Sequence, residues 1–199
     1  MKLSTLLQGF ATQVGGPDVD VLDLTSDSRE VRAGWAFLAL RGEKVDGATF
    51  APQALAQGAV AVISEAPLAL PEGVASATFD GDARLRMADL ARRLHGAPDE
   101  RLAVLGVTGT NGKTTTTTLI RQLLRGAGLG CGLVGTVLNA AGDLEVEAVR
   151  TTPESPSFYR WLHRGVEAGD VASAVEVSSH ALCLGRVHGA RFRVGLFTN

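Results

Sequence analysis

The chain has 199 residues, of which 45% are hydrophobic and 20% charged, and these proportions are typical of a soluble globular protein with one or two domains. Its formal net charge is -2 and it has no basic run, so the charge pattern argues against a nucleic-acid or anionic-membrane partner. Its longest apolar runs, such as residues 59–63, are far shorter than the roughly 20 residues that a membrane-spanning helix needs.

The first residues of the chain contain only a short apolar segment, which polar residues interrupt. This pattern favours a short amphipathic helix over a secretory signal peptide. Cys131 and Cys183 are the only cysteines, and their spacing is not that of a metal or redox site. We therefore expect both thiols in or near the core, and we expect the protein in the reducing cytoplasm.

Residues 1–98 are predicted to form a small α/β domain. Apolar runs of strand length occur at residues 35–40 and 59–64, and helical periodicity occurs at residues 51–58 and 82–96. Asp82 is a suitable N-cap for the last of these helices, and a glycine ends it. A proline and three charged residues follow, so we place the domain boundary after residue 98.

Residues 99–199 show a regular alternation of strand and helix patterns. This alternation predicts a doubly wound, mainly parallel sheet of the P-loop ATPase type, interrupted by one hairpin at residues 138–149. The chain stops after an apparent strand, where the ligand groups of such sheets lie, so we expect a truncated second domain. The predicted strands are residues 101–109, 129–137, 171–179 and 192–199, and the predicted helices are residues 114–126 and 153–169.

The turn between the first strand and helix of this second domain has the parts of a phosphate-binding loop. Gly109 and Gly112 let backbone N–H groups approach phosphate oxygens. Lys113 supplies the cation for the β- and γ-phosphates, Thr114 supplies a hydroxyl for Mg²⁺, and the helix N-terminus faces the anion. We expect Thr115 to make a further phosphate contact.

The spacing of this loop and its run of threonines both differ from the usual phosphate loop. The usual G-x-x-x-x-G-K-[ST] spacing requires glycine at position 107, where the sequence has Val107. The alternative interpretation is a glycine-rich turn whose lysine is merely solvated. Threonine disfavours a helix interior, but a run of threonines is tolerated in a first turn, where hydroxyls satisfy free backbone donors. The loop's composition therefore favours phosphate binding.

The segment "GTNGKTT" resembles the ATP-binding loop of the Mur ligases and of their folylpolyglutamate synthase relatives, whose Thr-Asn-Gly-Lys form explains the departure from the usual spacing. The resemblance implies ATP as the nucleotide, with Mg²⁺, and Lys113 as a catalytic residue. The nucleotide-binding residues would be Gly109, Thr110, Asn111, Gly112, Lys113, Thr114 and Thr115.

Residues 27–47 resemble the N-terminal uridine-nucleotide domain of the Mur ligases. Residues 150–162 and 176–187 are similar in particular to the Mur ligases that add the third amino acid to UDP-N-acetylmuramoyl-L-alanyl-D-glutamate. On residue types alone, Asp27-Ser28 is a helix cap or turn, and Thr151-Thr152-Pro153 is a helix start. The resemblance assigns the substrate contacts to Ser28, Glu43, Lys44, Val45, Thr151, Thr152, Ser178 and Arg186.

Glu176 stands at the end of an apolar strand, where an unpaired buried carboxylate is costly. Binding of ATP-associated Mg²⁺ together with Thr114 would remove that cost, as strand-end acids do in phosphoryl-transfer sites. A salt bridge to an arginine such as Arg186 is the alternative. The resemblance supports the first interpretation, with Glu176 as a metal ligand and catalytic residue.

The reaction that the resemblance implies is ATP-dependent amide ligation through an acyl phosphate. Its partners would be the UDP-MurNAc-dipeptide and an amino acid (diaminopimelate, lysine or ornithine), and we expect a monomer. The second metal site and the C-terminal domain of the relatives are absent from the sequence, so we expect the chain alone to be inactive. Another Mur ligase, a folylpolyglutamate synthase and a non-catalytic nucleotide-binding fragment are the alternatives.

Overall fold

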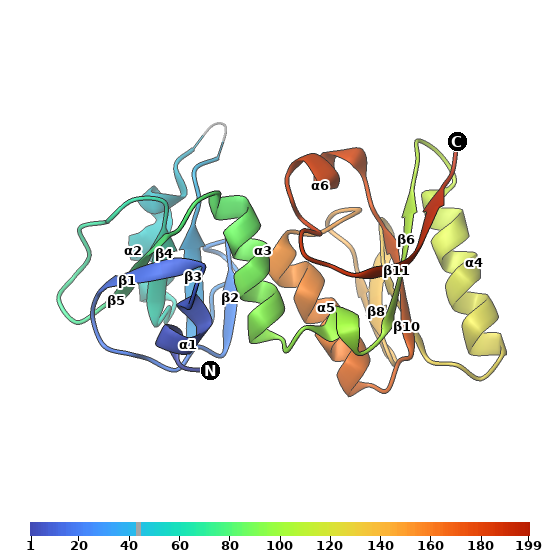
Figure 1. Ribbon diagram of the computed structural model, residues 1–199, viewed down its shortest axis with the longest axis horizontal. Helices are drawn as coiled ribbons and strands as arrows, with labels where there is room; N and C mark the ends of the chain where they lie inside the picture. Colours follow the sequence, from blue (N-terminus) through green and yellow to red (C-terminus); the bar gives the residue numbers. More distant parts are fainter. Residues whose placement is uncertain (43–44) are drawn as a thin grey trace. The chain divides into compact units, whose positions relative to one another are not determined.

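The computed structural model describes residues 1–42 and 45–199, and it divides into two compact units, Met1–Leu94 and His95–Asn199 (Figure 1). The predicted substrate residues Glu43 and Lys44 lie outside the described residues. No helix in the described ranges combines the length and apolar character needed to cross a membrane.

The first unit contains a mixed sheet with the strand order β1-β5-β4-β3-β2. Strands β2 to β5 run parallel, and β1 is antiparallel to β5. The interior strand β4 is buried along its whole length, as expected for a strand that is covered on both faces. The strands are β1 (Ala11–Gly15), β2 (Asp23–Thr25), β3 (Trp35–Ala39), β4 (Ala61–Ser64) and β5 (Ala75–Phe79).

Helices α1 (Leu3–Leu7), α2 (Ala51–Ala56) and α3 (Ala83–Leu94) complete this unit. The predicted cap of α3 is present, because the Asp82 carboxylate accepts hydrogen bonds from the N–H groups of Arg84 and Leu85. The leucines of α1 are buried, which agrees with the expected amphipathic helix. The first unit therefore has the small α/β architecture that its sequence predicts.

The second unit contains a sheet with the order β11-β6-β10-β7-β8-β9. Its first four strands in this order are parallel, and β8 and β9 form an antiparallel hairpin at one edge. The mainly parallel α/β class predicted from the sequence is thereby confirmed. The strands are β6 (Ala103–Thr108), β7 (Cys131–Val134), β8 (Leu138–Ala141), β9 (Leu144–Glu147), β10 (Ala172–Glu176) and β11 (Phe192–Phe197).

Helices α4 (Lys113–Gly126) and α5 (Ser155–Glu167) cover opposite faces of this sheet, and the short helix α6 (Ser179–Cys183) follows β10 (Figure 1). Residues 95–98, which precede the predicted boundary, belong to this second unit. The ring of His95 packs against that of His163 on α5, with centroids 5.3 Å apart. Phe158, Tyr159 and Leu162 of α5 are fully buried, so this helix forms much of the core on its face.

The strand register brings three loops to one edge of the second sheet. Glu176 at the end of β10 pairs with Val107 of β6, and Val175 pairs with Val134 at the end of β7. The carboxyl ends of these parallel strands therefore lie side by side. Ligands of open α/β sheets bind at this edge.

Candidate active site

The phosphate loop joins β6 to α4 through two glycines in conformations that side chains rarely adopt. The φ angle of Gly109 is 135° and that of Gly112 is 84°. A Cβ atom on Gly109 would also collide with the backbone of Thr198 in β11's continuation. Glycine at position 109 is therefore required both by backbone conformation and by the close approach of a neighbouring strand.

Lys113 folds back over the loop. Its Nζ donates hydrogen bonds to the carbonyl oxygens of Gly109, at 2.6 Å, and Thr110, at 3.2 Å. These partly negative oxygens hold the ammonium above the loop, where a phosphate would be an alternative acceptor. The lysine is thus not merely solvated, as the alternative interpretation of the turn required.

The amides of the loop divide into two groups. The N–H groups of Thr110 and Asn111 both donate to a main-chain oxygen of Asn199, at 2.6 and 3.0 Å, so the segment that follows β11 engages them. The first N–H groups of α4 have no acceptor within the helix, and its N-cap, Gly112, offers no side chain to satisfy them. This helix N-terminus is therefore a suitable site for phosphate oxygens.

Glu176 is 1% exposed and lies at the carboxyl edge of the sheet, next to the loop. Its Oε2 accepts hydrogen bonds from the hydroxyls of Thr114 and Thr136, each at 3.0 Å. Its Oε1 accepts one from the Thr136 N–H, at 2.8 Å. The structure therefore brings together the two predicted metal ligands, Thr114 and Glu176, although 62 residues separate them in the sequence.

The surroundings of Glu176 fit a bound cation. No basic side chain of the described residues forms a salt bridge with its carboxylate, so neutral donors alone hold the buried charge. Gly135 leaves room for that carboxylate, since a Cβ at this position would collide with Oε1 of Glu176. A carboxylate and a hydroxyl beside a phosphate loop are the hard oxygen ligands that nucleotide-bound Mg²⁺ uses.

The described residues contain no cluster of three or more histidine, cysteine or acidic side chains that could hold a metal by themselves. Magnesium in nucleotide sites usually takes only one or two protein ligands and completes its shell with phosphates and water. The pair Thr114 and Glu176 is consistent with this kind of site.

Arg186 does not pair with Glu176, and the alternative salt bridge considered above is wrong. Its Nη2 lies 2.7 Å from Oε1 of Glu154, and its Nη1 donates to the Thr152 carbonyl oxygen at 3.0 Å. The Arg186 side chain is only 7% exposed. It therefore fixes the turn that leads into α5.

The other residues predicted to contact substrate in this unit surround the same edge. The buried hydroxyl of Thr152 donates to the Glu176 carbonyl oxygen at 2.7 Å and accepts from the Ser178 N–H at 3.1 Å. The Ser178 hydroxyl caps α6 by accepting from the Ala181 N–H. Thr151 is half-buried, and its hydroxyl lies 3.1 Å from that of Thr136.

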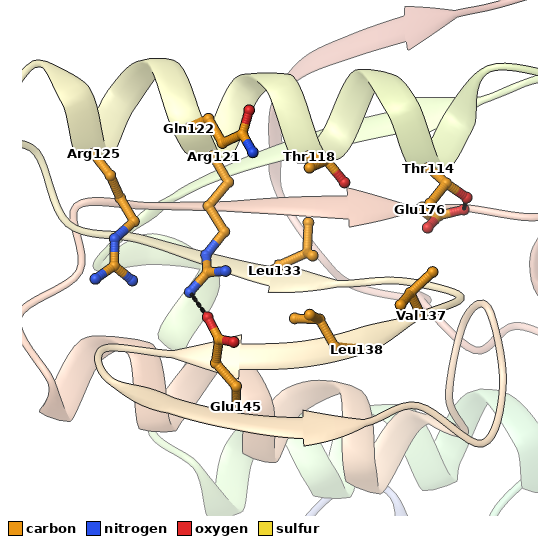
Figure 2. A pocket seen from close by; sticks show the side chains of 10 residues that line it. All are labelled: Thr114, Thr118, Arg121, Gln122, Arg125, Leu133, Val137, Leu138, Glu145 and Glu176. Carbon is orange, nitrogen blue, oxygen red and sulfur yellow. Dashed lines mark hydrogen bonds and ion pairs between the residues drawn. The ribbon is translucent and has the colours of Figure 1, made fainter.

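A cavity of about 470 Å³ lies between α4 and the β8–β9 hairpin, and it extends from Thr114 and Glu176 toward Arg125 (Figure 2). Arg121 reaches from α4 to β9: its Nη2 lies 2.7 Å from Oε1 of Glu145, and its Nε donates to the Cys131 carbonyl oxygen. Arg125 donates to the Gly142 carbonyl oxygen at 3.1 Å. The two arginines thus attach the hairpin to the helix that follows the phosphate loop.

The remaining predicted residues lie in the first unit. The buried hydroxyl of Ser28 donates to Oε1 of Gln53 at 3.0 Å, and Val45 is 51% exposed. A cavity of about 290 Å³ in this unit is lined by residues that are near Val45 in the sequence, such as Arg41, Asp46 and Ala48. Neither Ser28 nor Val45 lines this cavity, so the described residues do not bring these two predicted substrate contacts into one pocket.

Two residues that the sequence did not single out belong to the site. Gly135 makes room for Glu176, and Thr136 donates to both of its oxygens. The sequence gives only a weak indication of these two residues: a Gly-Thr pair follows an apolar strand. In the structure that strand is the neighbour of the strand that ends in Glu176. The strand order is needed to recognise it, because the carboxyl ends of adjacent parallel strands meet at one edge.

Comparison with known families matches nearly the whole chain. Residues 107–199 match the model described as "Mur ligase middle domain". Residues 22–106 match the model described as "Mur ligase family, catalytic domain". The two matches adjoin at the strand before the phosphate loop.

Among curated proteins, the chain is 46% identical over 202 residues to the UDP-N-acetylmuramoyl-L-alanyl-D-glutamate--2,6-diaminopimelate ligase of Geobacillus kaustophilus (strain HTA426); the match covers 100% of this chain and 40% of the relative. A solved structure of a ligase with the same name is 32% identical, with a TM-score of 0.72 over 90% of this chain and 36% of that one.

A MurF ligase from Thermotoga maritima, solved in complex with ADP, is 25% identical with a TM-score of 0.53; the match covers 79% of this chain and 32% of that one. This chain spans about 40% of the length of the curated relatives that it matches. Both family models, the sequence identity and the shared fold lead to the same conclusion: the chain belongs to the Mur ligase family.

Proposed function

We propose that this chain carries the uridine-nucleotide and ATP sites of a MurE-type ligase, which joins the third amino acid to UDP-MurNAc-L-Ala-D-Glu. The observation that carries the proposal is the contact between Thr114 and the buried Glu176 beside a Thr-Asn-Gly-Lys loop. The relatives are named as 2,6-diaminopimelate ligases, which supports this amino acid as the one added.

In the proposed reaction, the γ-phosphoryl group of ATP passes to the terminal carboxylate of the bound dipeptide. The amine of the third amino acid attacks the acyl phosphate, and inorganic phosphate leaves as the amide forms. Lys113 and the first N–H groups of α4 bind and orient the phosphates. Thr114 and Glu176 would hold Mg²⁺, which neutralises phosphate charge when it is bound with ATP.

We place the dipeptide end of the substrate at Thr151 and Ser178, because these residues border the same sheet edge as Glu176. The engaged groups of Thr152 and Arg186 suit a different task, which is to hold the substrate-facing turn in place. Residues 1–98 would bind the uridine nucleotide near Ser28 and residues 43–45, and residues 99–199 would bind ATP. By this assignment the enzyme works in the cytoplasm as a monomer.

Calorimetric titration of the 199-residue chain tests the proposal. We expect binding of Mg²⁺ with a non-hydrolysable ATP analogue, and separately binding of UDP-MurNAc-L-Ala-D-Glu. UDP-MurNAc-L-Ala, the UDP-MurNAc-tripeptide and a tetrahydrofolate serve as comparison ligands for the other members of the superfamily. Tighter binding of any of these, or no binding of the ATP analogue, would contradict the assignment.

A further inference from the structure

Thr136 occupies a position between the two halves of the candidate active site in the second unit. Its N–H donates to Oε1 of Glu176, and its hydroxyl lies 3.0 Å from Oε2 of the same carboxylate. The same hydroxyl lies 3.1 Å from that of Thr151. One exposed residue thus contacts both the proposed metal ligand and the proposed substrate residue.

The protons of this group can be assigned in one consistent way. A carboxylate only accepts hydrogen bonds, and each threonine hydroxyl has a single proton to donate. All three groups are satisfied when Thr151 donates to Thr136 and Thr136 donates to Glu176. The orientation of the Thr151 hydroxyl therefore depends, through Thr136, on the charge and position of Glu176.

The local fold holds Thr136 in this position. Gly135, the preceding residue, lies so close to Glu176 that a side chain there would displace the carboxylate. The Asn139 side chain accepts a hydrogen bond from the Gly135 N–H, which fixes the turn between β7 and β8. The contact of Thr136 with Glu176 is thus built into the backbone of the turn.

We propose that Thr136 is a positioning residue that links Mg²⁺·ATP binding at Thr114 and Glu176 to binding of the UDP-muramyl-dipeptide at Thr151. This inference rests on the function proposed above. When Glu176 engages the nucleotide-bound cation, its hydrogen bond with Thr136 keeps the Thr151 hydroxyl in the orientation that the dipeptide meets. Each substrate should then strengthen binding of the other, because coupling between two sites is reciprocal.

The test is calorimetric titration of the 199-residue chain with Mg²⁺ and a non-hydrolysable ATP analogue, with and without saturating UDP-MurNAc-L-Ala-D-Glu. In the unsubstituted chain we expect the dipeptide to tighten analogue binding by at least about 5-fold, the lower end of typical coupling factors. Thr136→Val, which keeps the backbone N–H and removes the hydroxyl, should reduce this factor to about 1.

Thr136→Ser should preserve the coupling, since it retains the hydroxyl. Thr116→Val, on α4 and outside the hydrogen-bonded group, is the matched control and should behave as the unsubstituted chain does. Thr136→Ser and Thr116→Val should melt within a few degrees of the unsubstituted chain, whereas Thr136→Val, which removes one donor from the buried Glu176 carboxylate, should stay folded but melt lower. This readout separates a role in coupling from a general role in stability.

Three results would overturn the inference. Coupling that survives in Thr136→Val, or that is absent from the unsubstituted chain while both substrates bind, refutes the role of Thr136 and leaves the proposed function intact. Failure of the unsubstituted chain to bind the ATP analogue refutes the proposed function, and the inference with it.

Discussion

The Thr114 hydroxyl donates a hydrogen bond of 3.0 Å to Oε2 of Glu176, and this bond joins the first turn of α4 to the end of β10. The carboxylate is 1% exposed and has only neutral donors around it among the described residues. A buried charge of this kind is expensive unless a cation or a sufficient set of donors compensates it. The bond therefore marks a place where a bound cation would compensate the carboxylate.

Glu176→Gln should abolish the dependence of ATP-analogue binding on Mg²⁺, because it removes the charge and keeps the size of the side chain. In the unsubstituted chain we expect Mg²⁺ to tighten binding by about 10-fold or more, in the range seen when groups that hold a metal are changed. Titrations with Mg²⁺ and with EDTA measure the ratio. Glu147→Gln, on the exposed strand β9, is the control, and an unchanged ratio in Glu176→Gln would remove the carboxylate from the metal site.

Lys113→Met should weaken ATP-analogue binding by about 10- to 100-fold, which corresponds to the roughly 1.5–3 kcal/mol that a hydrogen bond to a charged group contributes. Among the described residues the ammonium contacts only loop carbonyls, so its loss should leave the melting temperature nearly unchanged. Lys2→Met, at an exposed ion pair in the first unit, controls for the loss of a lysine. Full affinity in Lys113→Met would favour the interpretation of the loop as a simple turn.

Gly135→Ala should displace the Glu176 carboxylate, because the new Cβ would collide with Oε1 and lie 3.2 Å from Cδ. We expect an unfolding free energy lower by about 1–3 kcal/mol, as for other overpacked sites, together with weaker Mg²⁺-dependent nucleotide binding. Urea unfolding and calorimetry measure the two effects. Gly126→Ala, where a Cβ meets open space, should leave both unchanged or slightly improve stability.

The elements predicted correctly are those with a continuous apolar run, a long periodic pattern or a marked terminus. Helix α3 was predicted from its apolar spacing and Asp82, and both agree with the structure. The sequence does not predict strands β1, β2 and β5, since each is short and mixes polar with apolar residues. Their strand conformation depends on pairing with sheet neighbours, which a local pattern does not contain.

Some residues of the candidate site could be predicted from the sequence and others could not. The phosphate loop could be predicted because Gly109 to Thr115 are contiguous, so their spacing alone expresses the chemistry. The role of Thr136 could not, because 40 residues separate it from Glu176 and only the order of β7 and β10 brings them together. The ion-pair partner of Arg186 could not be predicted from the sequence either. Arg186 pairs with Glu154 and not with Glu176 because of the turn before α5.

The attachment of the β8–β9 hairpin predicts different effects for two arginines of α4. Arg121 is 12% exposed and makes both an ion pair and a backbone hydrogen bond, so Arg121→Met should lower the unfolding free energy by about 1–3 kcal/mol. The ion pair of Arg125 is exposed, so Arg125→Met should change it by less than about 1 kcal/mol. Urea unfolding of both variants measures the difference, and equal effects would mean that Arg121 does not anchor the hairpin.

The two cysteines should differ sharply in reactivity, contrary to the expectation that both lie in or near the core. Cys183 is exposed, whereas Cys131 is buried in β7 and its burial raises the pKa of the thiol. Ellman's reagent should therefore modify one thiol in the native chain and two after denaturation, and Cys183→Ser should remove the native reaction.

The raised pKa of Cys131 also has a consequence for stability. The unfolded thiol ionises at about pH 8.5 and the folded thiol only at higher pH, so the folded state keeps the proton to a higher pH than the unfolded state does. The contribution of this thiol is fully present below about pH 8.5 and decreases as the pH rises further. Cys131→Ala should flatten that part of the stability profile, as measured by urea unfolding between about pH 7 and 10. Rapid native labelling of Cys131 would show that β7 opens to solvent and would contradict both expectations.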